Sequence, residues 1–215
     1  MIRNMLRKIT SQYHLNAITL GEFSRMKVKG MQFDIWAFHA EGLGHVSAMT
    51  ARGFFGLMKM DTLIINPTDK DMPLFSYDRV RAMGSDTLIC ELYDTLLEQA
   101  DLSGIEAVKE RYAILPDHDL GKHWYDHIKL SQSLSKKTKG LDPSFDACAM
   151  EYLEAFLEAA EAAPFCDPAG KNGKASVYVE GLLTNGGPST DVFKKGIGIE
   201  KTEFLFRHFL FGTTR

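Results

Sequence analysis

The chain has 215 residues, of which 45% are hydrophobic and 25% are charged, and its formal net charge is −3. This composition is ordinary for a globular protein and excludes a chain that is disordered throughout. The slightly negative net charge excludes a globally basic nucleic-acid-binding protein, so an anionic partner would need a local basic patch.

Cysteine usage and hydropathy favour a cytoplasmic protein with no nucleic-acid or membrane partner. The three cysteines, Cys90, Cys148 and Cys166, are odd in number and widely spaced, which predicts free thiols and no cysteine zinc site. The first ten residues, MIRNMLRKIT, lack the apolar core of a signal peptide. No apolar stretch approaches the roughly 18 residues that span a bilayer.

The first half of the chain predicts an antiparallel sheet. Residues 3–18 are expected to form a short basic helix, and five or six strands follow between about residues 25 and 93. Their connections have two to six residues, too short for helical crossovers, so the strands should pair antiparallel. The clearest strand segments are 31–40 (MQFDIWAFHA), 44–51 (GHVSAMTA), 57–66 (LMKMDTLIIN), 72–80 (MPLFSYDRV) and 85–93 (SDTLICELY).

The second half is predicted to be mainly helical. Apolar residues recur at spacings of three and four within 92–100, 105–114 and 142–163, with Asp142 as a candidate N-cap and Pro143 at the first helical position. Residues 116–142 read as polar and irregular, and residues 164–174 (PFCDPAGKNGK) as a loop. Three further helical segments, 176–183, 189–196 and 199–211, complete the chain.

Strands followed by helices indicate an α+β fold. Because each amphipathic face needs a cover, the simplest packing is a three-layer α/β/α sandwich with a central, mainly antiparallel sheet. No internal repeat or composition break divides the chain, so residues 1–215 are expected to form a single domain.

Asp78 is the most informative single residue of the sheet. Alternation along its strand places Ser76, Asp78 and Val80 on one face, and Tyr77 and Arg79 on the other. A carboxyl on an apolar face has a raised pKa and can act as a proton donor. The alternative is that the strand ends here and Asp78 caps the turn, paired with a neighbouring arginine.

Two other patterns are candidate sites. His123 and His127 are four residues apart and His118 is close, a spacing that could bind a metal on a helix, but no further ligand motif accompanies them. A polar surface segment is the simpler interpretation. The glycines of 184–190 (TNGGPST) lack the residues of a phosphate loop and read as a helix stop and restart.

Three segments, in order, resemble the ferredoxin-dependent bilin reductases. Residues 62–80 (TLIINPTDKDMPLFSYDRV) contain a strand-ending proline, a short linker and a Pro-Leu-Phe-x-x-Asp segment. Residues 141–160 are similar to the long helix of that family, and residues 192–211 to its C-terminal helices and final Leu-Phe. The resemblance, carried by the order and spacing of these segments, spans about residues 30–211.

The resemblance implies an α/β/α sandwich that binds a biliverdin-like linear tetrapyrrole between the sheet and the C-terminal helices. It implies single electrons from a reduced ferredoxin or flavodoxin, a radical mechanism, and no bound flavin, haem or metal. The family's proton-donating acid falls on Asp78. Thr62, Ser76, Arg79 and Arg81 are expected to contact the substrate, the two arginines through its propionates.

Two departures from the family pattern leave a second interpretation open. Some members have a histidine five residues before the strand-ending proline, where this chain has Thr62. A second acid is common in the family near the loop before the last helices, and here only Asp191 is near that loop. Glu91, on the strand that follows the strand of Asp78, is the best substitute for this second acid. The chain is therefore either an oxidoreductase or a non-catalytic tetrapyrrole-binding protein of the same fold.

Overall fold

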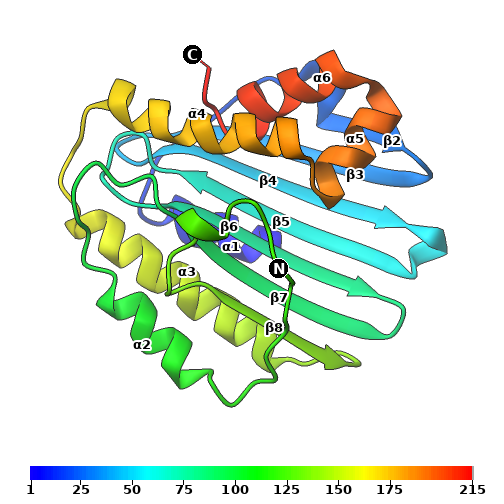
Figure 1. Ribbon diagram of the computed structural model, residues 1–215, viewed down its shortest axis with the longest axis horizontal. Coiled ribbons are helices and arrows are strands. Elements are labelled where there is room, and N and C mark those ends of the chain that lie inside the picture. The colour runs from blue at the N-terminus through cyan, green and yellow to red at the C-terminus, as the bar shows by residue number, and fades with distance from the viewer. Residues whose placement is uncertain (215) are drawn as a thin grey trace.

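The computed structural model describes residues 1–214 and has one eight-stranded antiparallel sheet at its centre (Figure 1). The strand order is β1-β3-β4-β5-β6-β7-β8, and β2 also pairs with β3. Short connections join the consecutive strands from β3 through β7, so that neighbours in the chain pair antiparallel, as predicted. The strands are β1 (Leu15–Ala17), β2 (Arg25–Val28), β3 (Met31–Ala40), β4 (Gly44–Gly53), β5 (Met58–Asn66), β6 (Leu74–Ala82), β7 (Ser85–Tyr93) and β8 (Leu134–Lys139).

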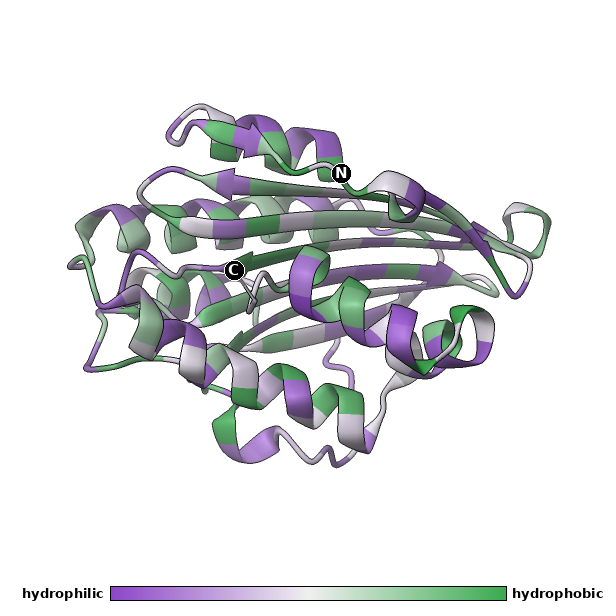
Figure 2. Ribbon diagram, turned by 90° about the horizontal axis from the view of Figure 1, so that it is seen from above, coloured by the Kyte–Doolittle hydropathy of each residue, from purple (hydrophilic) through white to green (hydrophobic). Residues whose placement is uncertain are grey.

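Helices cover both faces of the sheet, so the predicted three-layer α+β sandwich is confirmed (Figure 2). One face packs on α1 (Ile2–Thr10), α2 (Ser103–Arg111) and α3 (Ser144–Ala162). The other face packs on the C-terminal elements α4 (Pro168–Asn185), α5 (Pro188–Ile197), α6 (Ile199–Phe204) and the π-helix η4 (Leu205–Leu210). Short 3₁₀ turns are η1 (Gly21–Ser24), η2 (Phe54–Gly56) and η3 (Asp126–Ile128).

Alternation along β6 divides its side chains between the two layers. Phe75 is fully buried on the α3 side, where its ring stacks on Phe156 with ring centroids 5.1 Å apart. Ser76 and Asp78 face the C-terminal helices. The alternation predicted from the sequence therefore holds, and β6 continues to Ala82, so Asp78 lies inside the strand and does not cap its end.

Several segments differ from their prediction for identifiable reasons. Strand β8 forms by pairing with β7 in a region expected to be irregular. Its polar sequence is accommodated because Lys136 buries its stem while its ammonium donates hydrogen bonds to Asp117 and the Leu115 carbonyl. Helix α4 begins within the expected loop, where Asp167 accepts hydrogen bonds from two first-turn amides.

Two other helix predictions differ from the structure, one in length and one in kind. The N-terminal helix ends at Thr10, and the short edge strand β1 follows it. No helix forms over 92–100, where β7 runs on to Tyr93. Helix α3 begins at Ser144, one residue after the position predicted from Pro143. Among residues 1–214, no helix is both long and apolar enough to cross a membrane.

Candidate functional site

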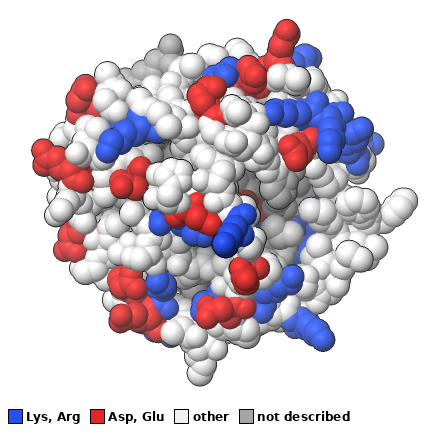
Figure 3. All heavy atoms as spheres, viewed as in Figure 1, with Lys and Arg blue, Asp and Glu red and all other residues white. Residues whose placement is uncertain are grey.

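A cavity of about 290 Å³ lies between the sheet and the C-terminal helices. Figure 3 shows a hollow on this face with acidic atoms at its bottom. Its floor is formed by β4 to β7, its walls by α4, α5 and η4, and its cover by the segment 120–125. The residues that carry the argument below are Thr62, Ser76, Asp78, Glu91, Tyr93, His123, Trp124, Tyr125 and Tyr178.

Asp78 is at the floor of the cavity, where the sheet register places it opposite Thr62 on one side and Ile89 on the other. The Thr62 hydroxyl donates a 2.5 Å hydrogen bond to Asp78 Oδ1. Burial raises the pKa of Asp78 to about 7, against the lowering effect of the Thr62 hydrogen bond, and the nearby charge of Glu91 raises it further. At neutral pH a large fraction of Asp78 therefore carries a proton that it can donate.

Glu91 adds a second carboxyl on the adjacent row of the same face, opposite Ser76. Only 7% of the residue is exposed, and its Oε2 accepts a 2.5 Å hydrogen bond from the Tyr93 hydroxyl. Its Oε1 has no hydrogen-bond partner among the described residues, although the Lys129 ammonium is 3.6 Å away. The floor of the cavity thus offers an acceptor without a hydrogen bond, ion-paired with Lys129, beside a protonatable acid.

Aromatic rings form the wall beside these two carboxyls. Tyr93 stacks on Tyr178 of α4 with ring centroids 4.2 Å apart, and Tyr125 meets Tyr93 edge-on at 5.4 Å. Burial raises the pKa of both Tyr93 and Tyr178 well above its ordinary value, so both hydroxyls stay protonated. Flat, apolar walls with few polar groups suit a planar conjugated ligand.

The cover contributes donors that the sequence analysis missed. His123 and Trp124 both line the cavity, and neither His123 Nδ1 nor Trp124 Nε1 has a hydrogen-bond partner in the described part of the chain. His123 Nδ1 can donate or accept a hydrogen bond, depending on the tautomer of the ring, whereas the indole N–H of Trp124 can only donate. The three consecutive ring-bearing residues His-Trp-Tyr at 123–125 could have indicated a buried or ligand-binding segment within a stretch that is otherwise polar.

The other predicted site residues are not all in the cavity. Ser76 lines it, as do Ser189 and Thr190 at the start of α5. Asp191 does not line the cavity and is exposed, with its carboxylate close to Gly186. The structure thus brings Thr62, Ser76, Asp78 and Glu91 together and leaves Asp191 outside.

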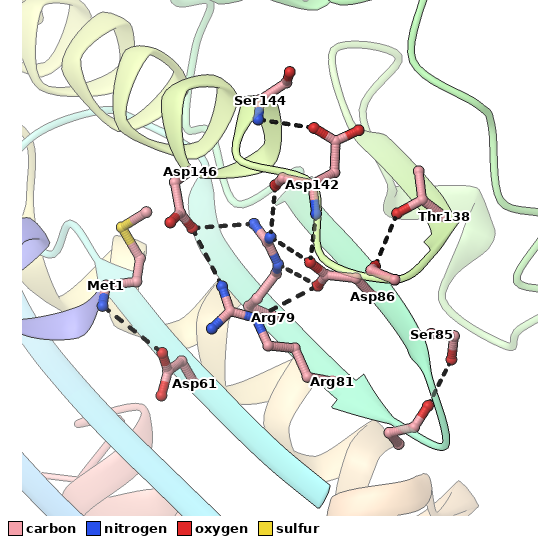
Figure 4. A network of polar contacts seen from close by, with 12 residues as sticks. Met1, Asp61, Arg79, Arg81, Ser85, Asp86, Thr138, Asp142, Ser144 and Asp146 are labelled. Carbon is pink, nitrogen blue, oxygen red and sulfur yellow. Dashed lines mark hydrogen bonds and ion pairs between the residues drawn. The ribbon is translucent and has the colours of Figure 1, made fainter. Parts of the chain in front are cut away.

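Arg79 and Arg81 are on the opposite face of the sheet, in a network with carboxylates of β7 and α3 (Figure 4). Arg79 is 2% exposed, and its guanidinium binds both oxygens of Asp86 at 2.5 and 2.6 Å. Arg81 is within 3.5 Å of Asp146. This placement corrects the expectation that the two arginines meet substrate carboxylates in the cavity of Asp78, because alternation turns them away from it.

The histidine pattern does not converge on a metal site. His123 faces the cavity, whereas His127 Nδ1 is 2.9 Å from the Trp124 carbonyl within its own turn. Among residues 1–214, no group of three or more histidine, cysteine, aspartate or glutamate side chains is arranged to hold a metal ion.

Comparison with known proteins identifies the fold. No protein-family model matches the chain, and no curated protein sequence matches it. The structure is similar to the crystal structure of phytochromobilin synthase from tomato in complex with biliverdin, with a TM-score of 0.80 and 14% sequence identity. The match covers 99% of this chain and 82% of that chain. The chain therefore has the fold of a biliverdin-binding synthase, as its sequence resemblance implied.

Proposed function

We propose that this protein binds a biliverdin-like linear tetrapyrrole in the cavity and reduces it with electrons from a ferredoxin or flavodoxin. The observation that carries the proposal is the Asp78 carboxyl, whose pKa is raised to about 7 at the floor of an aromatic cavity. The shared fold with a protein solved with biliverdin supports the ligand class. An acid poised near neutral pH is suited to protonate a reduced ligand.

The chemistry requires two electrons and two protons for each double bond reduced. A ferredoxin supplies electrons singly, so an odd-electron bilin forms after the first transfer. Asp78 donates a proton to it, and the Thr62 hydrogen bond then stabilises the aspartate that remains. Glu91 is the second carboxyl in reach of the same ligand face.

The polar groups of the cavity also match the ligand. Pyrrole N–H groups can donate to Asp78 and to Oε1 of Glu91, which has no hydrogen-bond partner among the described residues. The Trp124 indole N–H, on the cover, can donate to a ligand carbonyl or carboxylate. Buried polar groups without a partner are uncommon in native proteins, so a ligand that satisfies these atoms is favoured.

A second function, tetrapyrrole binding without catalysis, rests on a specific observation. Thr62 replaces the histidine found in some bilin reductases, and the exposed Asp191 does not line the cavity. If Glu91 does not supply the missing proton, the chain would bind a bilin without completing its reduction.

The first test is binding. Adding the protein to biliverdin should shift and sharpen the visible absorption of the pigment, saturating at one bilin per chain, because the rigid cavity restricts its conformers. An unchanged spectrum with excess protein would reject both functions.

The second test is turnover of Asp78→Asn with reduced ferredoxin under anaerobic conditions. Asn keeps the shape but cannot donate a proton as an acid, so bilin binding should persist while reduction slows by about 10²–10⁴-fold. An electron spin resonance signal of the bilin radical should accumulate. Asp191→Asn is the matched control and should turn over normally, because Asp191 lies outside the cavity. Wild-type rates in Asp78→Asn would contradict the catalytic role and leave binding alone.

A further inference from the structure

Three hairpin turns meet side by side at one end of the sheet, at the right of Figure 1. They join β2 to β3, β4 to β5 and β6 to β7. The register aligns them across the sheet, since Gln32 pairs with Arg52, and Met58 pairs with both Gly53 and Ala82. The end of β8 joins the same row through the pair Ser85–Lys139.

Large apolar side chains project from these turns into solvent. Phe55 is fully exposed, Met83 is 97% exposed, and Phe54 is 61% exposed. Leu57 and Leu141 are also exposed, the latter just after β8. An exposed apolar cluster of this kind lowers solubility, and in monomeric proteins it usually marks a surface that contacts a protein, a membrane or another ligand.

Backbone strain is concentrated in the same three turns. Among the described residues, the non-glycine residues with positive φ are Lys29, Phe54, Phe55 and Met83, with φ between 50° and 55°. Turn positions with positive φ favour glycine or asparagine, and bulky side chains there are costly. The chain therefore holds a lysine, two phenylalanines and a methionine where folding alone would favour glycine or asparagine, which points to a use for these side chains.

Exposed cations surround the apolar turns, although the whole chain has a net charge of −3. We call the following residues the tip surface: Phe54, Phe55, Leu57, Met83 and Leu141, with the cations Lys27, Lys29, Arg52, Lys59 and Lys139. None of these five cations forms an ion pair with another described residue, whereas Asp34, Asp61 and Asp86 of the same strands are each in an ion pair. In Figure 3 this end of the molecule protrudes as uncharged surface with basic groups near it.

We propose that the tip surface docks on the anionic surface of a lipid bilayer. Protruding aromatic and aliphatic side chains enter the headgroup region without needing a matching concave partner, while the surrounding lysines and arginine attract anionic lipids. Four of the five cations are lysines, which are depleted in protein–protein interfaces, so charge and composition favour lipid over an acidic protein.

Surface docking needs no membrane-spanning segment. No stretch of the sequence is long enough to span a bilayer, which predicts no membrane partner of the spanning kind, but contact through hairpin turns does not require such a stretch. The inference is independent of the proposed function, since the tip surface includes none of the cavity residues.

The test is flotation of the full-length protein with vesicles of phosphatidylcholine containing phosphatidylserine, compared with vesicles of phosphatidylcholine alone. The protein should float with the anionic vesicles only, and high salt should reduce binding because it screens the lysines. The double substitution Phe54→Ser/Phe55→Ser should weaken binding by about tenfold or more, from the apolar burial that is lost. Ile114→Ser is the matched control, because Ile114 is 92% exposed but lies outside the tip surface.

A charge reversal separates the two components. Lys59→Glu should weaken binding to anionic vesicles, whereas Arg7→Glu changes the net charge equally on the exposed side of α1 and should not. Absence of wild-type binding to anionic vesicles, or equal binding by the phenylalanine variant, would overturn the proposal. Concentration-dependent dimerisation in solution that the phenylalanine substitutions abolish, without vesicle binding, would instead assign the surface to a second copy.

Discussion

Two adjacent residues of β6 show how strongly a side chain's chemistry depends on its face of the sheet. Asp78 faces the cavity, where burial raises its pKa to about 7. Arg79 faces α3, where it is buried against Asp86 and lies over the Phe145 ring at 4.8 Å. The arginine predicted to bind a substrate carboxylate is bound to a carboxylate of its own chain.

Arg79→Met should therefore affect stability and leave ligand binding unchanged. The substitution leaves Asp86 buried without its main cationic partner, which should lower the free energy of unfolding by about 3–5 kcal/mol. Arg81→Met, at a partly exposed position, should cost about 1 kcal/mol or less. Urea denaturation of both variants measures the difference.

The double variant Arg79→Met/Asp86→Leu provides the control, since it removes both charges and should recover much of the lost stability. Bilin affinity of folded Arg79→Met should equal that of the wild type. A weaker affinity in folded protein would restore the propionate-binding role for Arg79.

At the scale of elements, the cover over the cavity depends on one close contact with α4. Trp124 packs so tightly on Gly181 that a Cβ built on the glycine would lie 2.2 Å from the indole ring. Glycine is unfavourable inside a helix, so its presence here is explained by the space that Trp124 needs. The contact fixes the segment that brings His123, Trp124 and Tyr125 over the sheet.

Gly181→Ala should displace Trp124 and loosen the cover. The overpacking should cost about 1–3 kcal/mol, more than alanine gains through its helix propensity. The matched control is Gly173→Ala in the same helix, where nothing lies within 4 Å of the added Cβ and stability should rise. In a Trp36→Phe background, the fluorescence of Trp124 should shift to longer wavelength only in Gly181→Ala. An unshifted emission would show that the cover does not depend on this contact.

At the scale of the whole molecule, the C-terminal wall of the cavity is attached to the sheet by three buried donors. His45 Nε2, Ser47 Oγ and Asn66 Nδ2 are each 2.6 to 2.8 Å from the successive carbonyl oxygens of residues 209–211. Burial lowers the pKa of His45 to about 4, so the imidazole is neutral and donates from Nε2. The same segment carries cavity-lining side chains, so the sheet and the chain's end are folded as one unit.

The two shifted groups give opposite pH dependences of stability between about pH 4 and 7. Asp78 binds its proton more tightly in the folded state, so its contribution is present at low pH and is lost as the pH rises through about 7. His45 binds its proton less tightly in the folded state, so its contribution is present above about pH 6.5 and is lost as the pH falls toward 4.

Substitution should separate these contributions. Relative to the wild type, Asp78→Asn should gain stability as the pH rises from 4 to 7, by a few kcal/mol at most. His45→Gln keeps a donor but does not titrate, so it should lose less stability than the wild type as the pH falls. Urea unfolding at a series of pH values measures both, and parallel pH profiles for wild type and Asp78→Asn would contradict the raised pKa.

The sequence by itself determined the properties that each segment carries locally. Connection lengths of a few residues required an antiparallel sheet, and alternation along β6 placed Asp78 and Ser76 on one face. The periodicity over 142–163 located α3 to within two residues at its start. These properties could be predicted because they depend on neighbouring positions and on the fixed geometry of strands and helices.

Only the tertiary structure decided which distant groups meet. The pairing of Arg79 with Asp86, the placement of 120–125 over the cavity and the alignment of three strained turns all depend on how elements pack. Periodicity tells which face of an element is apolar but not which partner covers it, since that choice is made by shape and charge complementarity across the core. The raised pKa of Asp78 is the clearest case. The sequence predicts the carboxyl on an apolar face of the sheet, and the helices that bury it raise its pKa to about 7, so that it can donate a proton near neutral pH.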